Sequence, residues 1–369
     1  SRLLLKPRGG SFGRRAVPGD CRCRQEARCS AAEDAPLTSL LRAFSPVMLL
    51  QPTFDLNSMD VLVTGGAGFI GSHVADMLVE EGHCVDVMDN LSAGRREYVP
   101  DEATLHVLDV RSEAAAELVR ARSFDALVHH AAQIDVRASV QDPTHDAGVN
   151  VLGLLNLMEA GRRSSLQNVV FASTGGAIYG EPEYTPQDET HPERPVSPYG
   201  VAKRSAEHYL QYYARQFDMD VVSLRYANVY GPRQNPAGDA GVVAIFVGEM
   251  LGGAQPVING AGDQTRDYVY VADVARANVQ ALDHEGCDLV NIGTAQETSV
   301  TDLFRLIKAT TGADVAEKHG PSLPGEQKRS VLDYAKAQSV LGWEPKTSLR
   351  EGLGKTVEWF SNDAPVQAP

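Results

Sequence analysis

A tyrosine and a lysine four residues apart are the residues of this 369-residue sequence best suited to acid–base chemistry. Pro198 favours the start of a helix directly before them, so Tyr199 and Lys203 would lie one turn apart on one helix face. Because an ammonium group beside a phenol favours the phenolate, we expect Lys203 to lower the pKa of Tyr199 from its usual value of about 10. A tyrosine that exchanges a proton near neutral pH suits the interconversion of an alcohol and a carbonyl group.

Two hydroxyl residues, Ser173 and Thr174, directly follow the apolar run 168–172, which is typical of a buried strand. Ligands of open parallel sheets bind at the C-terminal ends of the strands, so we predict that both residues take part in catalysis. The hydroxyl of Thr174 could hydrogen-bond the same substrate oxygen that Tyr199 serves. A Tyr-x-x-x-Lys spacing also occurs by chance on surface helices. Here a glycine-rich motif earlier in the chain favours the catalytic interpretation.

That motif places Gly65, Gly68 and Gly71 between a short apolar run, 60–64, and an amphipathic helical pattern. The first glycine allows a tight turn, the second lets the backbone approach a pyrophosphate, and the third lets the helix pack closely against the strand. The start of the helix then offers free N–H groups and a positive dipole end to the phosphates. This arrangement predicts a dinucleotide site, and a glycine turn that serves only packing is the alternative.

Asp89 ends the second apolar run, 18 positions after Gly71. A carboxylate at this place can accept hydrogen bonds from both ribose hydroxyls of NAD, and it repels the 2′-phosphate of NADP. We therefore predict NAD as the cofactor, and Arg95 and Arg96 leave NADP open as the alternative.

Short apolar runs continue to alternate with helical patterns as far as residue 172. This alternation predicts an α/β fold with a Rossmann-type, doubly wound parallel sheet, followed by a smaller C-terminal α/β substrate domain. The composition agrees with a globular protein, since 43% of the residues are hydrophobic and 22% are charged.

The net charge of −14 and the isoelectric point of about 5.2 argue against general binding of nucleic acid. No apolar stretch is long enough for a transmembrane helix, so no membrane association is expected. Cys84 and Cys287 are the only cysteines after residue 58, which favours a reducing, cytoplasmic location. His129 and His130 lack a cysteine or carboxylate at ligand spacing, so we predict buried, neutral histidines and no metal site.

Residues 1–58 are basic, rich in Gly, Pro and Ser, and without sustained periodicity, so we expect a leader or non-native extension there. A transit peptide and a functional basic arm are the alternatives. The apolar run 3–5 is too short for a secretory signal. The spacing of Cys21, Cys23 and Cys29 matches no metal-binding pattern.

From Met59 to about Trp359, the sequence resembles the extended short-chain dehydrogenase/reductases, and within them the nucleotide-sugar epimerases of the UDP-glucose 4-epimerase type. The resemblance implies NAD-dependent 4-epimerisation of a UDP-hexose through a transient 4-keto sugar, with Tyr199 as the residue that removes and returns the proton. The motifs that carry it are Gly65–Gly71, Asp89–Asn90, Asp109–Val110, His129–Ala132, Ser173–Thr174, Tyr199–Lys203 and Leu224–Pro232.

The resemblance also implies which residues bind the ligands. Lys203 resembles the residue that contacts the nicotinamide ribose, and Asp109 resembles the one that accepts a hydrogen bond from the adenine amino group. The implied cofactor-binding residues are Gly65, Gly68, Phe69, Ile70, Gly71, Asp89, Asn90, Asp109, Val110, Ala131, Ala132, Gln133 and Lys203. The implied substrate-binding residues are Thr174, Tyr199, Asn228 and Arg266 at the diphosphate or sugar, together with Arg329 and Ser330.

The chain departs from the family pattern at Leu323, where many relatives carry a phosphate-binding arginine. We expect Arg329 to supply that charge, with Lys328 as the weaker alternative. Arg266 could instead form an ion pair with a neighbouring aspartate, Asp263 or Asp267. The resemblance places Ser330 beside the C2 substituent of the sugar, where a small side chain leaves room for an N-acetyl group; generic packing is the alternative. We therefore expect UDP-GlcNAc and UDP-GalNAc as further substrates.

The composition of the two ends and this resemblance together give four expected segments. They are the extension at 1–58, an NAD-binding Rossmann domain at 59–227 with a returning strand near 268–271, a nucleotide-sugar-binding domain at 228–362 and a tail at 363–369. The helix from Asn150 and the helix after Tyr199 resemble those that form a dimer interface in relatives, so a homodimer is expected.

Three other functions remain open at this stage. A UDP-uronate 4-epimerase would need an arginine that the sequence does not identify. A nucleotide-sugar dehydratase or decarboxylase would need an acidic residue after Thr174, where this chain has Gly175 and Gly176. A non-enzymatic NAD(H)-sensing module is the least supported, because both Tyr199 and Lys203 are present.

Overall fold

The computed structural model describes residues 58–236, 241–322 and 327–362. The predictions for residues 1–57, with their three cysteines, for Leu323 and for the tail 363–369 lie outside the described residues.

The described residues contain one large parallel sheet, as the sequence predicts. Adjacent strands all pair in parallel, and the strand order reverses direction between β1 and β4, where doubly wound folds bind their ligands. In sheet order the strands are β11 (Cys287–Ile292), β6 (Asp220–Tyr226), β5 (Asn168–Thr174), β4 (Ala126–His129), β1 (Asp60–Thr64), β2 (Cys84–Asp89) and β3 (Thr104–Val107).

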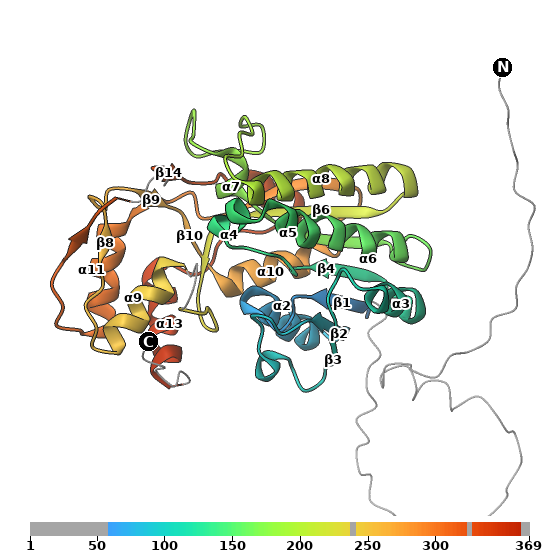
Figure 1. Ribbon diagram of the computed structural model, residues 1–369, viewed down its shortest axis with the longest axis horizontal. Helices are drawn as coiled ribbons and strands as arrows, with labels where there is room; N and C mark the ends of the chain where they lie inside the picture. Colours follow the sequence, from blue (N-terminus) through green and yellow to red (C-terminus); the bar gives the residue numbers. More distant parts are fainter. Residues whose placement is uncertain (1–57, 237–240, 323–326, 363–369) are drawn as a thin grey trace, which may run out of the picture. The chain divides into compact units, whose positions relative to one another are not determined.

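Helices cover both faces of this sheet (Figure 1). One face carries α2 (Phe69–Glu80) and α10 (Val271–Ala281), and the other carries α3 (Glu113–Arg122), α6 (Leu154–Gly161) and α8 (Pro198–Phe217). Successive strand residues supply the two cores alternately: Val61 and Val63 pack with the first face and Leu62 with the second. The predicted α/β doubly wound sheet is therefore confirmed.

The region before α6 differs from the single helix expected over 150–160. It contains α4 (Val136–Gln141), α5 (Pro143–Ala147) and a π-helical turn, η3 (Gly148–Gly153), which leads into α6. Asp135 and Asp142 cap the two short helices with their carboxylates. Each of these aspartates is a recognisable helix start, and the π-helical turn has no comparable signal in the sequence.

The smaller α/β part has a core of its own and lies beyond one end of the main sheet (Figure 1). Its helices are α9 (Val242–Leu251), α11 (Val300–Thr311) and α13 (Leu349–Asn362). Its strands are β7 (Asn228–Tyr230), β8 (Ile258–Asn259), β9 (Thr265–Arg266), β10 (Tyr268–Tyr270), β12 (Thr298–Ser299), β13 (His319–Gly320) and β14 (Arg329–Ser330). Three further short elements are η2 (Arg96–Tyr98), α7 (Gly175–Tyr179) and α12 (Ala335–Leu341).

The prediction that a strand near 268–271 returns to the main sheet is wrong. This segment forms β10, which pairs with β7 in a separate two-stranded sheet. The strand that returns is β11, which pairs with β6 at the edge of the main sheet. Helix α10 joins the two strands and packs against α2, so the chain crosses back one element later than expected.

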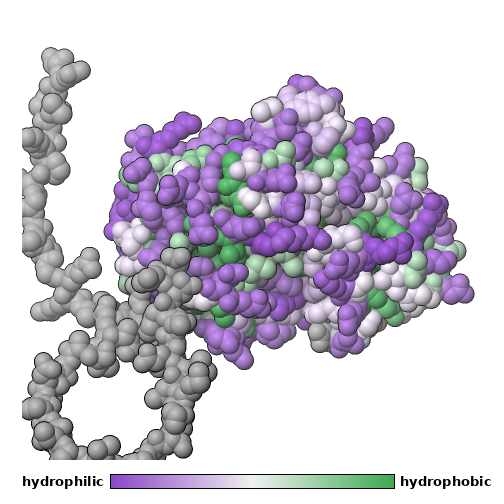
Figure 2. All heavy atoms as spheres, turned by 180° about the vertical axis from the view of Figure 1, so that it is seen from behind, coloured by the Kyte–Doolittle hydropathy of each residue, from purple (hydrophilic) through white to green (hydrophobic). Residues whose placement is uncertain are grey.

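The face of the molecule in Figure 2 is mainly hydrophilic, and its hydrophobic residues form separate small patches. None of the helices in the described ranges is both long and apolar enough to cross a membrane.

Candidate active site

The glycine-rich turn joins β1 to α2 and is sterically closed to larger residues. Gly65 has φ +67°, and a Cβ atom there would lie 2.7 Å from the backbone nitrogen of Ala131. A Cβ atom on Gly71 would lie 2.2 Å from the Gly65 carbonyl oxygen. No side chain caps α2 at Gly68, so the N–H groups of its first turn, which includes Phe69 and Ile70, point outward from a bare helix end. This is the geometry that accepts a pyrophosphate.

We expect Gly71→Ala to release the cofactor, because the added methyl group would force the turn apart. The free energy of unfolding should also fall by about 1–3 kcal/mol, the usual cost of overpacking. NAD(H) released on denaturation and a thermal melting curve measure the two effects. Gly148→Ala is the matched control, since a Cβ atom there meets open space. Equal NAD(H) content in both variants would contradict this role of Gly71.

Acidic residues end the strands on the β2 and β3 side of this turn. The Asp89 carboxylate accepts from the backbone N–H groups of Ala67, at 3.1 Å, and of Leu91, at 2.8 Å, so it ties the glycine turn to the residues after β2. Asn90 follows and accepts from the Ser92 N–H at 3.0 Å. Both predicted residues therefore lie at the C-terminal edge of the sheet beside the turn.

Asp109 follows β3 and is held by Arg111, which the sequence reasoning missed. The two guanidinium bonds to the carboxylate measure 2.9 and 2.6 Å, and they are the main reason that the pKa of Asp109 falls to about 2. Val110 is buried against the π-helical turn, where a Cβ atom on Gly153 would lie 2.7 Å from Val110 Cγ2.

The segment after β4 lies directly against the glycine turn. The Ala131 N–H donates to Thr64 Oγ1 at 3.3 Å, and Ala132 follows it. The Gln133 side chain is fully used inside the protein, because it bonds the backbone of Asp135 and the carboxylate of Asp146. The backbone of Gln133 is engaged as well, because its N–H donates to Asn150 Oδ1 at 3.0 Å and its carbonyl accepts from Asn150 Nδ2 at 2.9 Å.

Tyr199 and Lys203 lie one turn apart on α8, with Lys203 Nζ 6.0 Å from the centre of the Tyr199 ring. Lys203 is buried, and its ammonium group donates to the Ala172 carbonyl at 2.8 Å, at the end of β5. Tyr199 is partly exposed, and its backbone N–H donates to Ser139 Oγ at 3.3 Å. The pair therefore adjoins the strand end that carries the two predicted hydroxyl residues.

The electrostatics of the pair correct the sequence argument. Burial, followed by the charge of Asp146, raises the pKa of Tyr199. Burial lowers the pKa of Lys203 to about 8, and the charges of Asp146 and Glu207 oppose that shift. The expectation that Lys203 lowers the pKa of Tyr199 is wrong for the protein's own groups, because burial and the charge of Asp146 raise this pKa.

Two neutral histidines lie near this pair. Burial, with the charge of Lys203 as a further cause, lowers the pKa of His129 and of His130 to about 3. His129 Nδ1 lies 2.8 Å from Thr64 Oγ1, and His130 Nε2 lies 3.2 Å from the Tyr226 hydroxyl. Both shifts agree with the prediction of uncharged histidines. No cluster of three ligand-type side chains occurs in the described ranges.

Ser173 and Thr174 have different surroundings, because successive strand residues point to opposite faces. Thr174 is partly exposed and accepts from the Ala177 N–H at 3.3 Å, which caps α7. Ser173 is buried, and its hydroxyl donates to Glu207 Oε1 at 2.6 Å. Thr174 is thus the more accessible of the two hydroxyl residues, whereas the Ser173 hydroxyl is engaged by Glu207 inside the protein.

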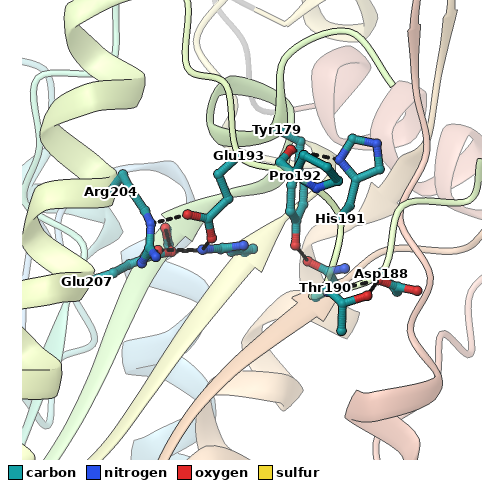
Figure 3. A network of polar contacts seen from close by, with 11 residues as sticks. Tyr179, Asp188, Thr190, His191, Pro192, Glu193, Arg204 and Glu207 are labelled. Carbon is teal, nitrogen blue, oxygen red and sulfur yellow. Dashed lines mark hydrogen bonds and ion pairs between the residues drawn. The ribbon is translucent and has the colours of Figure 1, made fainter. Parts of the chain in front are cut away.

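Glu207 belongs to an ion-pair network of four residues: Glu193, Arg204, Glu207 and Arg225 (Figure 3). Arg225 binds Glu207 through two bonds of 2.9 and 2.6 Å, and it also binds Glu193 at 2.6 Å. Arg204 pairs with the same two carboxylates. The side chains of Glu207 and Arg225 are completely buried, so the network fixes α8 against β5 and β6.

Beyond the network, polar contacts continue along the sheet edge (Figure 3). Arg225 Cζ lies 4.9 Å from the centre of the Tyr179 ring, and the Tyr179 hydroxyl donates to Asn291 Oδ1 at 2.8 Å. Asn291 in turn donates to the Gln187 carbonyl at 3.0 Å, and Gln187 bridges to Leu332. This path connects the Tyr–Lys helix to the segment that carries Ser330.

Three of the predicted substrate residues, Arg266, Arg329 and Ser330, lie on the short three-stranded sheet. Ser330 on β14 is the register partner of Arg266 on β9, and a Cβ atom on Gly176 would lie 3.7 Å from Ser330 Oγ. Ser330 therefore lies between Arg266 and the segment after Thr174. Asn228 is exposed at the start of β7.

The two candidate arginines have different partners. Arg266 donates through Nη1 to the Thr265 carbonyl at 2.8 Å. Arg329 is exposed and binds Glu297 through two bonds of 2.8 and 2.7 Å, with a third bond to Thr185 Oγ1. The guanidinium group of Arg329 is therefore engaged by Glu297.

Comparisons with known proteins agree with this geometry. Residues 61–293 match the NAD dependent epimerase/dehydratase family. The chain is 47% identical to a UDP-glucose 4-epimerase from Thermotoga maritima solved with UDP-glucose, over 82% of this chain and 99% of that one, with a TM-score of 0.81. The UDP-glucose 4-epimerase of Thermus thermophilus, solved with NAD, is 43% identical over 83% and 100% of the chains, with a TM-score of 0.78. A UDP-N-acetylglucosamine 4-epimerase from Methanobrevibacter ruminantium is 32% identical over 83% and 99%, with a TM-score of 0.79.

Proposed function

The chain belongs to the NAD dependent epimerase/dehydratase family, and from this premise we propose that it interconverts UDP-glucose and UDP-galactose by inverting C4 of the sugar. The observation that carries the proposal is the Tyr199–Lys203 pair on α8, which adjoins Thr174 at the C-terminal edge of a dinucleotide-type sheet. The relatives of known structure that are named UDP-glucose 4-epimerase match over four fifths of the chain or more.

The cofactor is NAD, and the residues at the sheet edge fit it. The glycine turn has no room for a Cβ atom at Gly71, and the first turn of α2 is uncapped. The turn would hold the pyrophosphate, Asp89 the adenosine ribose and Asp109 the adenine. When bound, NAD would take up and return the hydrogen that C4 loses and regains.

Tyr199 then acts as the acid and base of the reaction. It removes the proton of the sugar 4-hydroxyl group as the 4-keto sugar forms, and it returns that proton after the sugar has presented its other face. For Tyr199 to act as this base it must first lose its own proton, and the charge of Lys203, together with that of a bound nicotinamide cation, would favour this phenolate form. Thr174, partly exposed beside the pair, orients the reacting oxygen.

Arg266 and Asn228 bind the UDP diphosphate, and Ser330 faces the sugar at C2. The small Ser330 side chain supports acceptance of UDP-GlcNAc and UDP-GalNAc as well. One similar protein of known structure is itself a UDP-N-acetylglucosamine 4-epimerase. Guanidinium suits the phosphate partner because its donors are planar and paired.

We expect Ser330→Tyr to reduce kcat/KM for the N-acetylated pair by about tenfold or more, because the ring fills the space beside C2. Turnover of UDP-glucose and UDP-galactose should stay within about threefold of the wild type. Ser330→Ala, which adds no bulk, should retain both activities. A parallel loss for both substrate pairs would contradict the placement of Ser330 at C2.

Elimination or decarboxylation is less well supported by the site. A dehydratase needs an acid to protonate the leaving group, and the positions after Thr174 are Gly175, Gly176 and Ala177. The structure identifies no arginine dedicated to a uronate carboxylate in the described site, which leaves a neutral hexose as the better substrate.

Incubating the purified protein with a panel of UDP- and dTDP-sugars, and identifying the products by NMR, tests the proposal. We expect UDP-glucose and UDP-galactose to reach the same equilibrium mixture from either side. A dehydrated or decarboxylated product, or no product with NAD(H) bound, would show that the activity is a different one.

A homodimer and a cytoplasmic location complete the proposal. Exposed apolar residues on α4, η3 and α8 support a second copy of the chain as the partner. They are Val136, Val140, Leu152, Val201, Tyr209 and Tyr212. Cys84 and Cys287 are free thiols in the described ranges, which supports a reducing compartment.

A further inference from the structure

Asp146 is a buried carboxylate that the proposed mechanism does not use. It lies on the short helix α5, which packs against the Tyr–Lys helix α8, and only 1% of its surface is exposed. Both of its hydrogen bonds reach the same oxygen, Oδ1: Gln133 Nε2 donates at 3.0 Å and Asn150 Nδ2 donates at 3.0 Å. The second oxygen, Oδ2, is buried without a hydrogen-bond partner among the described residues.

An asparagine would make the same two bonds at this position. Its carbonyl oxygen can accept from Gln133 and Asn150, and no neighbouring donor would be lost. A buried ionised oxygen without a hydrogen bond is costly, and burial does raise the pKa of Asp146. The carboxylate of Asp146 therefore differs from an amide mainly in its negative charge. Because this charge is buried, a nearby cation is needed to balance it.

The cation whose charge acts on Asp146 is Lys203, which lies on α8, the helix that α5 packs against. Among the titratable groups around Lys203, His129 at the end of β4 and His130 directly after it are uncharged near neutral pH. Asp146 from α5 and Glu207 from α8 are the negative neighbours, and Asp146 is the stronger of the two. Glu207 is already paired with two arginines, which largely neutralise its charge, so it stabilises the Lys203 ammonium group less. His145, next to Asp146 in the chain, also acts on its charge.

We propose that Asp146 is a positioning residue whose buried charge holds Lys203 as an ammonium ion and sets the pH range in which the Tyr199–Lys203 pair works. This inference rests on the proposed function, since it assigns Asp146 to the same reaction centre. The carboxylate has one effect that favours catalysis and one that opposes it. It favours catalysis because it keeps Lys203 charged at alkaline pH. It opposes catalysis because it delays the loss of the Tyr199 proton as pH rises.

Asp146→Asn tests the proposal because it removes the charge and keeps both hydrogen bonds. Without the carboxylate the ammonium of Lys203 is less stabilised, so its pKa falls below about 8. The phenolate of Tyr199 is less repelled, so its pKa falls too. We expect both limbs of the pH profile of kcat/KM to move to lower pH by about 0.5–1.5 units. The rate at the optimum should change by less than about tenfold.

A second measurement does not depend on activity. The tyrosinate absorbance of each protein, minus that of its Tyr199→Phe counterpart, gives the ionisation of Tyr199, and this curve should shift to lower pH in Asp146→Asn. Asp142→Asn is the matched control: it makes the same charge change at the exposed N-terminus of α5, where asparagine also caps, and both curves should stay in place. If Asp146→Asn does not fold, Asp146→Ser serves in both measurements.

The proposal would be overturned if the pH profile of kcat/KM and the Tyr199 titration curve of Asp146→Asn both matched those of the wild type, even with a lower rate. A purely structural residue would change the rate without changing the pKa values. Equal shifts in Asp142→Asn would overturn it as well, since the effect would then be general electrostatics. A wild-type protein inactive on all UDP-sugars would refute the proposed function instead, and the tyrosinate titration would still decide the role of Asp146.

Discussion

Tyr199→Phe should lower kcat for UDP-glucose by about 10²–10⁴-fold, the usual contribution of a positioned acid–base group. The ring and the backbone bond to Ser139 Oγ remain, so binding of the substrate changes little and KM should stay within about threefold. Steady-state kinetics with UDP-glucose, monitored through formation of UDP-galactose, measure both constants.

Tyr212→Phe is the control for this variant. Tyr212 lies on the same helix with half of its surface exposed, and it contacts Tyr213 and Phe217 rather than the sheet edge. We expect wild-type kinetics for it. A Tyr199→Phe enzyme that keeps its full kcat would remove Tyr199 from the mechanism, whatever its position in the fold.

Arg225→Met should reduce the free energy of unfolding by about 3–5 kcal/mol, because it leaves Glu207 buried without its main partner. Burial works against the charge on Arg225, but its bonds to Glu207 more than offset this and raise its pKa. Both side chains are completely shielded from water, so neither charge can be solvated once the other is gone. Denaturant titration followed by circular dichroism measures the loss.

Arg204→Met is the matched control within the same ion-pair network. Arg204 is about one fifth exposed, and Arg225 continues to hold both carboxylates without it. Its loss should cost about 1 kcal/mol or less, as for other accessible ion pairs. If both variants lost a similar free energy of unfolding, the buried Arg225–Glu207 pair would contribute no more than an accessible ion pair.

The main sheet was predictable because each element is short, locally patterned and bounded by polar residues or glycine. The sequence pattern predicts a strand at 60–64, a glycine turn after it and a strand end at Asp89. The structure agrees with all three. The local sequence pattern could not show whether β10 or β11 is the strand that returns to the main sheet. Both are short apolar runs, and only long-range pairing distinguishes them.

The ion-pair network was missed for a related reason. Scattered charged residues usually lie at the surface, and nothing near Glu193 or Arg204 in the sequence points inward. Two signals were available: Arg225 interrupts an apolar strand, and Glu207 continues the helix face of Tyr199 and Lys203 by one more turn. Their meeting depends on the register of β5 with β6, which pairs Ser173 with Arg225.

The pKa of Tyr199 shows where local reasoning reaches its limit. A lysine one turn away lowers the pKa of a phenol in isolation, and the helix geometry was predicted correctly. Burial and the charge of Asp146, both products of the tertiary fold, outweigh that effect in the folded protein. Asp146 lies on α5, a helix too short to be recognised by its periodicity.

Epimerisation of UDP-glucose that carries deuterium at C4 tests the central claim most directly. If C4 is oxidised and reduced again by a cofactor that never leaves the site, the UDP-galactose formed keeps the deuterium at C4 and none appears in the water. Loss of the deuterium to solvent, or inversion that proceeds unchanged after NAD(H) has been stripped from the protein, would contradict the account.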